Sequence, residues 1–212
     1  LLTPHEVAHM AHAIETEKLG MQCGIQDQLA SAYGGINFMD MHAFPHASVS
    51  SLQLPNSIWW ELERRLAVVY IGTPHSSSDT HKKVIADLGS DARMDPRLQR
   101  LRELAREGKE ALYSGDLPRF GTCMNANTEA QRRLHPALVC PAFESIIATA
   151  NTHGALGCKV NGAGGDGGSL AILTDGDAAR KRRMLAELTE KGFRPIPLYL
   201  SRQGLRIWET PA

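Results

Sequence analysis

The chain carries two carboxylates near its start whose types and spacing suit chemistry on a hydroxyl group. Asp27 lies between Gln26 and Gln28 and follows a glycine turn at the start of a short expected helix. Peptide dipoles at a helix start favour the ionised carboxylate, which can orient a hydroxyl group and accept its proton. The flanking amides suit sugar hydroxyls. The simpler alternative is that Asp27 only caps the helix and that Glu15, upstream, is surface charge.

A second candidate is the glycine-rich stretch NGAGGDGG, residues 161–168, directly before the expected strand 169–174. Successive glycines let the backbone approach a ligand closely and present amide donors to phosphate or sugar oxygens. A turn between two strands is the alternative. Seven glycines lie between positions 154 and 168, and a hairpin needs fewer, so we expect a ligand-binding loop.

A third candidate is HEVAHMAH, residues 5–12, which matches the His-Glu-x-x-His pattern of zinc peptidases. On a helix, His5, His9 and His12 share one face. The opposite face is apolar, and we expect it to be the core side; its members are Val7, Met10, Ala11 and Ile14. The histidines are therefore predicted to face solvent, and a zinc peptidase is the weakest of the alternatives.

The elements that must position these residues alternate irregularly, which predicts an α+β fold. Thr3, Pro4 and Glu6 predict a capped helix that ends at Gly20. Further helices are expected within 26–33, 73–88, 96–116, 117–134, 141–155 and 177–192, and strands at 36–42, 48–54, 65–72, 169–174, 194–200 and 204–209. Residues 55–65 are the expected join between two subdomains, 1–54 and 55–212.

The composition describes an ordinary globular chain of 212 residues with 42% hydrophobic and 22% charged residues. Lys plus Arg equals Asp plus Glu, 23 each, so no overall field favours nucleic acid or an anionic membrane. The four cysteines lack paired spacing and are expected to be free thiols in the cytoplasm. No apolar run is long enough to span a bilayer.

Several stretches resemble the GHMP kinase superfamily, which phosphorylates small metabolites. IETEKLGMQCGIQDQLASAYGG, residues 14–35, is similar to a stretch that carries the catalytic Asp of these kinases, with Ile25 where Lys is common. Residues 154–173, GALGCKVNGAGGDGGSLAIL, resemble the family's glycine motif, with Asp166 where Gly is usual. The order of the matches predicts the C-terminal portion of a two-subdomain GHMP kinase fold, most similar to its sugar-1-kinase branch.

The resemblance implies that Asp27 is the catalytic base, that Glu15 binds Mg²⁺ and that ATP is the phosphoryl donor. Residues expected to bind substrate are Gln26, Gln28, Gly34, Gly35, Ser76, Gly162, Ala163, Gly164, Gly165 and Asp166. Residues expected to contact the nucleotide are Gly162, Gly164, Gly165 and Gly167. Capping is the alternative for Ser76.

The implied reaction is phosphorylation of the anomeric hydroxyl of D-glycero-D-manno-heptose 7-phosphate to the 1,7-bisphosphate, a step toward nucleotide-heptose and surface polysaccharide. An L-fucokinase is the alternative within the class, and a catalytically silent sugar-binding regulator is the alternative outside it. The partner is a small sugar phosphate, with no nucleic acid or membrane, and a homodimer is left open.

The family's ATP-binding loop, Pro-x-x-x-Gly-Leu-Gly-Ser-Ser-Ala, is expected upstream of the first helix, because its amides bind phosphates at a helix N-terminus. The chain begins at LLTPHEV, after that position. The 161–168 loop is not a substitute, since no Lys-Ser/Thr follows it. We therefore expect the 212 residues alone to lack kinase turnover.

Overall fold

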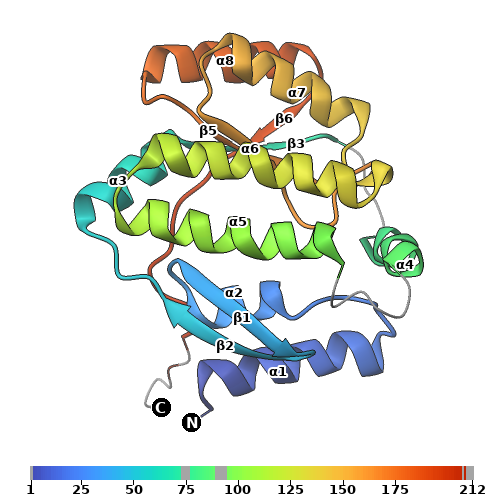
Figure 1. Ribbon diagram of the computed structural model, residues 1–212. Coiled ribbons are helices and arrows are strands. Elements are labelled where there is room, and N and C mark those ends of the chain that lie inside the picture. Colours follow the sequence, from blue (N-terminus) through green and yellow to red (C-terminus); the bar gives the residue numbers. More distant parts are fainter. Residues whose placement is uncertain (1, 73–76, 89–94, 207, 209–212) are drawn as a thin grey trace. The chain divides into compact units, whose positions relative to one another are not determined.

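The structure is a computed structural model that describes residues 2–72, 77–88, 95–206 and 208 (Figure 1). The chain divides into two compact units. The first unit comprises Leu1–Gln53 and Tyr199–Ala212, and the second comprises Leu54–Leu198. Helices and strands mix in both units, so the predicted α+β class is confirmed. The assignment of 1–54 and 55–212 to two GHMP kinase domains stays a prediction.

The first unit pairs two helices with a two-stranded hairpin. Helix α1 (Pro4–Ala13) begins with the predicted capping box, in which Thr3 and Glu6 each bond the other's backbone N–H. It runs directly into a π-helical turn, η1 (Ile14–Lys18), and Gly20 follows at φ 65°. Helix α2 (Gln26–Tyr33) precedes the antiparallel strands β1 (Asn37–Ala43) and β2 (His46–Ser51). The predicted helix was right in place, but its last turn is wider than α-helical.

The predicted orientation of α1 is wrong. Ala8 and His12 are buried, whereas Met10 and Ile14 are each 54% exposed. The histidine face is covered because the hairpin lies against it: the rings of His9 and His46 stack with centroids 5.5 Å apart. The prediction assumed that α1 packs against the core through its most apolar face. The neighbours that cover a helix are set by tertiary contacts, which its own periodicity does not encode.

The second unit is built on a four-stranded sheet in the order β4-β5-β3-β6, with every neighbouring pair antiparallel. Its strands are β3 (Leu66–Tyr70), β4 (Gly157–Val160), β5 (Ser169–Leu173) and β6 (Arg194–Ile196). Strand β4 had not been predicted. Strand β6 covers only the start of the expected 194–200, and residues 204–206 form no strand where one was expected.

Helices α7 (Pro141–Thr152) and α8 (Ala178–Glu190) cover one face of this sheet (Figure 1). Strand β3, α7 and β4 form one split β-α-β unit, with further helices between β3 and α7 in the chain, and β5, α8 and β6 form a second. Their fully buried side chains form the core of the second unit: Val69, Phe143, Ile146, Val160, Leu170, Ile172, Met184 and Leu188.

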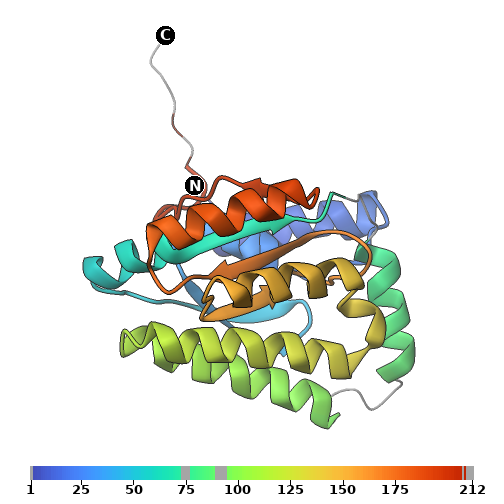
Figure 2. The same ribbon diagram turned by 90° about the horizontal axis from the view of Figure 1, so that it is seen from above.

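Among the described residues, the second unit has four further α-helices. They are α3 (Asn56–Arg65), α4 (Ser77–Leu88), α5 (Pro96–Tyr113) and α6 (Leu117–Leu134). Helix α3 occupies the segment expected as the subdomain join, directly after the boundary between the two units at Gln53 and Leu54, and its Trp59 and Leu62 are buried. Helices α5 and α6 run antiparallel and side by side in both views (Figure 2).

Helix α6 lies along β4, and two glycines allow the approach. A Cβ on Gly157 would lie 2.2 Å from the carbonyl oxygen of Gly121, and a Cβ on Gly121 would lie 2.6 Å from the carbonyl oxygen of Leu156. Such distances leave no room for a side chain on either residue. Side chains of α6 therefore reach the open edge of the strand.

Gly34 and Gly20 form a matched pair for a stability test, because both follow a helix at positive φ. A Cβ at Gly34 would lie 2.1 Å from the backbone nitrogen of Gly204, whereas Gly20 has nothing within 4 Å. We expect Gly20→Ala to cost about 1 kcal/mol from backbone strain alone. Gly34→Ala should cost at least about 2 kcal/mol more, since backbone must move. Urea unfolding of both variants measures this, and equal losses would contradict the packing.

Candidate functional site

A cluster of polar side chains in the first unit surrounds Glu15. The amide nitrogen Nε2 of Gln28 donates to Glu15 Oε2 at 2.6 Å. The Cys23 thiol donates to the same oxygen at 3.3 Å. Glu15 comes from the π-helical turn η1 and Gln28 from the first turn of α2. Two predicted site residues from separate elements, Glu15 and Gln28, are thus joined by a direct hydrogen bond. Cys23, which the sequence analysis had not singled out, contacts the same carboxylate.

Asp27 lies beside this cluster, in the first turn of α2. The N-cap residue of α2 is Ile25, and no side chain caps the helix. The alternative that Asp27 serves as the cap is therefore wrong. Its side chain is exposed, as is that of Gln26. A carboxylate at the positive end of a helix, free for a ligand, is what proton transfer from a hydroxyl requires.

The electrostatics of Cys23 show that the carboxylates are near one another. Burial raises the pKa of the Cys23 thiol, and the hydrogen bond to Glu15 raises it further. The negative charges of Glu15 and Asp27 add smaller upward contributions to the same pKa. Cys23 is thus held as a neutral thiol that donates to Glu15, and it senses both carboxylates at once.

The residues around Glu15 fit a Mg²⁺ ion. The Oε1 atom of Gln28 is buried without a hydrogen-bond partner among the described residues, so it is an oxygen donor left unused by the protein. The described residues hold no group of three His, Cys, Asp or Glu side chains arranged for a metal. Mg²⁺ commonly takes one or two carboxylates and completes its shell with waters and phosphates. Glu15 with Gln28 matches that donor set.

The glycine loop lies between β4 and β5 in the second unit. Gly165 N–H donates to the carbonyl of Leu138 at 3.2 Å. A Cβ on Gly164 would lie 2.0 Å from the same carbonyl oxygen, and Gly164 has φ 59°. Both residues are buried. Gly164 and Gly165 thus allow the loop to pack against the backbone at Leu138. This packing explains why glycine is present at both positions, and no ligand is needed to explain it.

The loop is partly exposed on both sides of these two residues. Gly162 has φ 58° with nothing within 4 Å of its missing Cβ, and Gly162 and Asp166 are exposed. Gly167 is buried, and Ala163 is half-buried. The carbonyl of Gly162 accepts from Gln131 Nε2 of α6 at 3.1 Å. The loop therefore has a fixed base at Gly164 and Gly165 and an open flank on each side.

Lys159 lies in β4, two residues before the glycine loop begins at Asn161. Its Nζ donates to the carbonyl of Val160 at 2.8 Å, and burial lowers the pKa of Lys159 to about 8. Since a half-buried lysine with such a pKa exchanges a proton near neutral pH, it is a chemically distinct group beside the loop.

The remaining predicted residues have other surroundings. Gly35 N–H donates to the carbonyl of Ser201 at 2.8 Å, and Gly34 lies against Gln203 and Gly204. The pair therefore receives the returning C-terminal segment of the first unit, and their role toward substrate stays a prediction. Ser76 lies outside the described residues.

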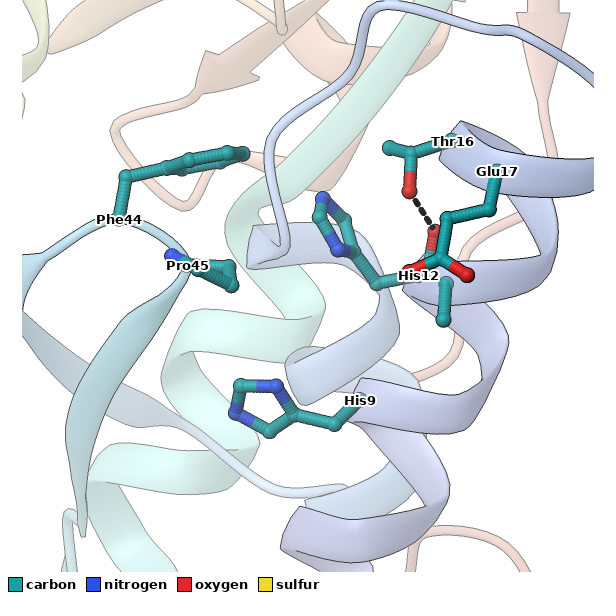
Figure 3. Close-up of a pocket in the computed structure, with 7 residues that line it drawn as sticks. His9, His12, Thr16, Glu17, Phe44 and Pro45 are labelled. Carbon is teal, nitrogen blue, oxygen red and sulfur yellow. Dashed lines mark hydrogen bonds between the residues drawn. The ribbon is translucent and has the colours of Figure 1, made fainter.

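The first unit also contains a cavity of about 430 Å³ on the histidine face of α1 (Figure 3). Its lining residues are His9, His12, Ala13, Thr16, Glu17, Phe44 and Pro45. Burial lowers the pKa of His9, and the neighbouring His5, His46 and His12 lower it further. Sequence reasoning missed this hollow because Phe44 and Pro45 reach it only through the hairpin.

Comparison with known proteins identifies part of the second unit. Residues 109–191 match the family described as GHMP kinases C terminal. Residues 109–191 form a GHMP kinase C-terminal domain. The matched segment contains α6, β4 and the glycine loop, so the loop predicted from sequence belongs to this domain.

The chain is 25% identical over 207 residues to D-glycero-alpha-D-manno-heptose 7-phosphate kinase of Campylobacter jejuni, covering 98% of the chain and 60% of that protein. It is 30% identical over 212 residues to mevalonate kinase of Thermococcus sibiricus, covering 97% and 58%. Among solved structures, mevalonate kinase of L. major in complex with R-mevalonate superposes with TM-score 0.69 at 24% identity, covering 90% and 55%. The predicted resemblance to the GHMP kinase fold is confirmed.

The chain spans about three-fifths of the length of these two curated relatives. Among the described residues, no helix combines the length and apolar character required to cross a membrane. The carboxylate cluster belongs to the first unit and the glycine loop to the second.

The geometry around Glu15 predicts a change in the reactivity of Cys23. Replacing Glu15 by Gln removes a negative charge and an acceptor that raise the thiol pKa, so more thiolate is present at pH 8 and alkylation speeds up. We expect a rate about two- to fivefold higher, measured by mass spectrometry of iodoacetamide-treated protein. The buried Cys123, Cys140 and Cys158 are internal controls, and an unchanged Cys23 rate would contradict the contact.

Proposed function

We propose that the chain acts within an ATP-dependent sugar kinase that phosphorylates the anomeric hydroxyl of heptose 7-phosphate. The observation that supports this most is the pairing of Glu15 with Gln28 at 2.6 Å beside the exposed Asp27. Similarity to a heptose 7-phosphate kinase over 98% of the chain supports the same class of reaction. The regulator alternative is weaker, because neither carboxylate is needed as a helix cap.

In this proposal Asp27 orients the sugar hydroxyl and takes its proton as phosphoryl transfer proceeds. Gln26, exposed on the same turn, hydrogen-bonds a neighbouring sugar hydroxyl. Glu15 and the free Oε1 of Gln28 hold Mg²⁺, which neutralises phosphate charge when MgATP is bound. Cys23 remains a neutral thiol that fixes the orientation of the Glu15 carboxylate.

The glycine loop contributes backbone donors rather than charge. With Gly164 and Gly165 seated on Leu138, backbone N–H groups on either side of them, including that of the half-buried Ala163, donate to phosphate or sugar oxygens. Asp166 stays exposed, which keeps its negative charge in water and limits its repulsion of a phosphate. The ATP-binding loop expected upstream remains a requirement for turnover.

A second candidate is a mevalonate kinase. It is favoured by the 30% identity to the mevalonate kinase of Thermococcus sibiricus, which is higher than the identity to the heptose kinase. The carboxylate cluster serves either acceptor equally, since each presents a hydroxyl. L-Fucose stays the alternative among sugars, and the expected cytoplasmic location and homodimer stay predictions.

Asp27→Asn tests the catalytic role in the complete protein. The amide cannot accept the hydroxyl proton, so we expect kcat to fall by a factor of about 10²–10⁴ with unchanged thermal stability. Asp40→Asn is the matched control, because Asp40 is an exposed carboxylate of the same unit. Wild-type turnover by the Asp27 variant would remove the residue from the mechanism.

An acceptor panel tests the substrate. We expect kcat/KM for heptose 7-phosphate to exceed that for L-fucose and mevalonate by at least about 10²-fold, since one unmatched charged group costs several kcal/mol in binding. The measurement is coupled-assay kinetics with each acceptor at equal MgATP. A preference for mevalonate would move the protein to the second candidate, while leaving the role of Asp27 intact.

A further inference from the structure

Helix α6 presents three polar side chains in one row toward β4 and the glycine loop. Asn125, Thr128 and Gln131 are spaced three residues apart, so they lie on one face of the helix. We call them the α6 polar row. Asn125 is exposed, but Thr128 and Gln131 are 3% and 8% exposed. Buried polar side chains on a helix need partners, and the row finds them on the backbone.

The first two members of the α6 polar row complete the open edge of the sheet. Asn125 donates to the carbonyl of Leu156 at 3.2 Å and accepts from Cys158 N–H at 2.8 Å. Thr128 donates to the carbonyl of Cys158 at 2.9 Å and accepts from Val160 N–H at 3.2 Å. These contacts replace the bonds that a fifth strand would make. They explain why the helix approaches so closely.

The third member, Gln131, continues past the end of β4 into the glycine loop. Its Nε2 donates to the carbonyl oxygen of Gly162 at 3.1 Å. In a planar trans peptide, the carbonyl of one residue and the N–H of the next point in opposite directions. A Gly162 carbonyl that faces α6 therefore turns the Ala163 N–H away from α6, and Ala163 is half-buried.

The side-chain amide of Gln131 is buried with only part of its hydrogen-bonding capacity used. Its Oε1 is buried with no partner among the described residues, so half of a buried amide is left unsatisfied. Packing alone would be served better by an apolar side chain of similar size. The hydrogen bond from Nε2 to the Gly162 carbonyl is therefore the interaction that explains an amide at this position.

We propose that Gln131 is a positioning residue of the glycine loop. It fixes the Gly162–Ala163 peptide so that the Ala163 N–H donates to a phosphoryl oxygen of the bound reactants. The position of the loop follows from the second unit alone, whereas the ligand named here rests on the proposed function.

The test compares Gln131→Leu with Thr128→Val in the complete protein. Each substitution removes hydrogen bonds between α6 and the backbone, but only the first acts on the loop. We expect kcat of Gln131→Leu to fall about tenfold, less than the loss of a whole donor, because the Ala163 N–H remains but is no longer held in place, and we expect KM for the acceptor to be nearly unchanged. Thr128→Val should lower the melting temperature at least as much and keep kcat within about twofold.

A second readout does not depend on catalysis. The carbonyl ¹³C resonance of Gly162 reports its hydrogen bond, and we expect it to shift in Gln131→Leu and to stay in place in Thr128→Val. If the wild-type protein phosphorylates no acceptor, the proposed function fails, and this resonance alone decides the positioning role. The proposal is overturned if the Gly162 resonance does not move in Gln131→Leu. It is also overturned if kcat falls in proportion to the loss of melting temperature in both variants alike.

Discussion

The hydrogen bond from Gln28 Nε2 to Glu15 Oε2, 2.6 Å long, is the contact on which the candidate site depends. It joins the π-helical turn after α1 to the first turn of α2, two segments separated by an irregular connection. Because Gln28 immediately follows Asp27 in the same turn, the bond that fixes Glu15 also fixes the backbone that carries Asp27. A π-helical turn is uncommon and is frequent at functional sites, and here it carries Glu15.

The same bond explains the state of Gln28. With Nε2 committed to a carboxylate, its Oε1 is left buried and has no partner among the described residues. An acceptor in that position has a cost unless a cation or donor meets it. The second unit shows a related arrangement at Gln131, whose Oε1 also finds no partner within the described part of the chain. In each unit, a glutamine side chain donates a hydrogen bond through Nε2 beside residues that we expect to contact the reactants. The two buried amide oxygens that lack a partner among the described residues therefore lie where we propose function.

Local sequence signals predicted much of this fold. The capping box of α1 and the turn at Gly20 depend on neighbours within a few residues, so Thr3, Pro4 and Glu6 were sufficient to predict them. The pairing of Glu15 with the α2 turn was anticipated only through resemblance to a family. The buried face of α1 was predicted wrongly, because the covering hairpin is encoded elsewhere in the chain.

The glycines show the same division. The turn at Gly20 is local, but the need for glycine at Gly34 and Gly164 comes from backbone of Gly204 and Leu138, which are distant in sequence. Sequence reasoning assigned both to ligand binding, since a glycine required for close backbone packing resembles one required for ligand approach. Strand β4 was missed because its hydrogen-bonding partners on one side are side chains of α6 rather than a strand.

The central claim is that the Asp27 carboxylate acts on the hydroxyl that receives the phosphoryl group. A crystal structure of the complete protein with Mg²⁺, a non-hydrolysable ATP analogue and heptose 7-phosphate tests it most directly. The account predicts an Asp27 oxygen about 2.6–3.2 Å from the anomeric hydroxyl, with Glu15 on the metal. An acceptor bound away from Asp27, with the carboxylate still in water, would contradict it.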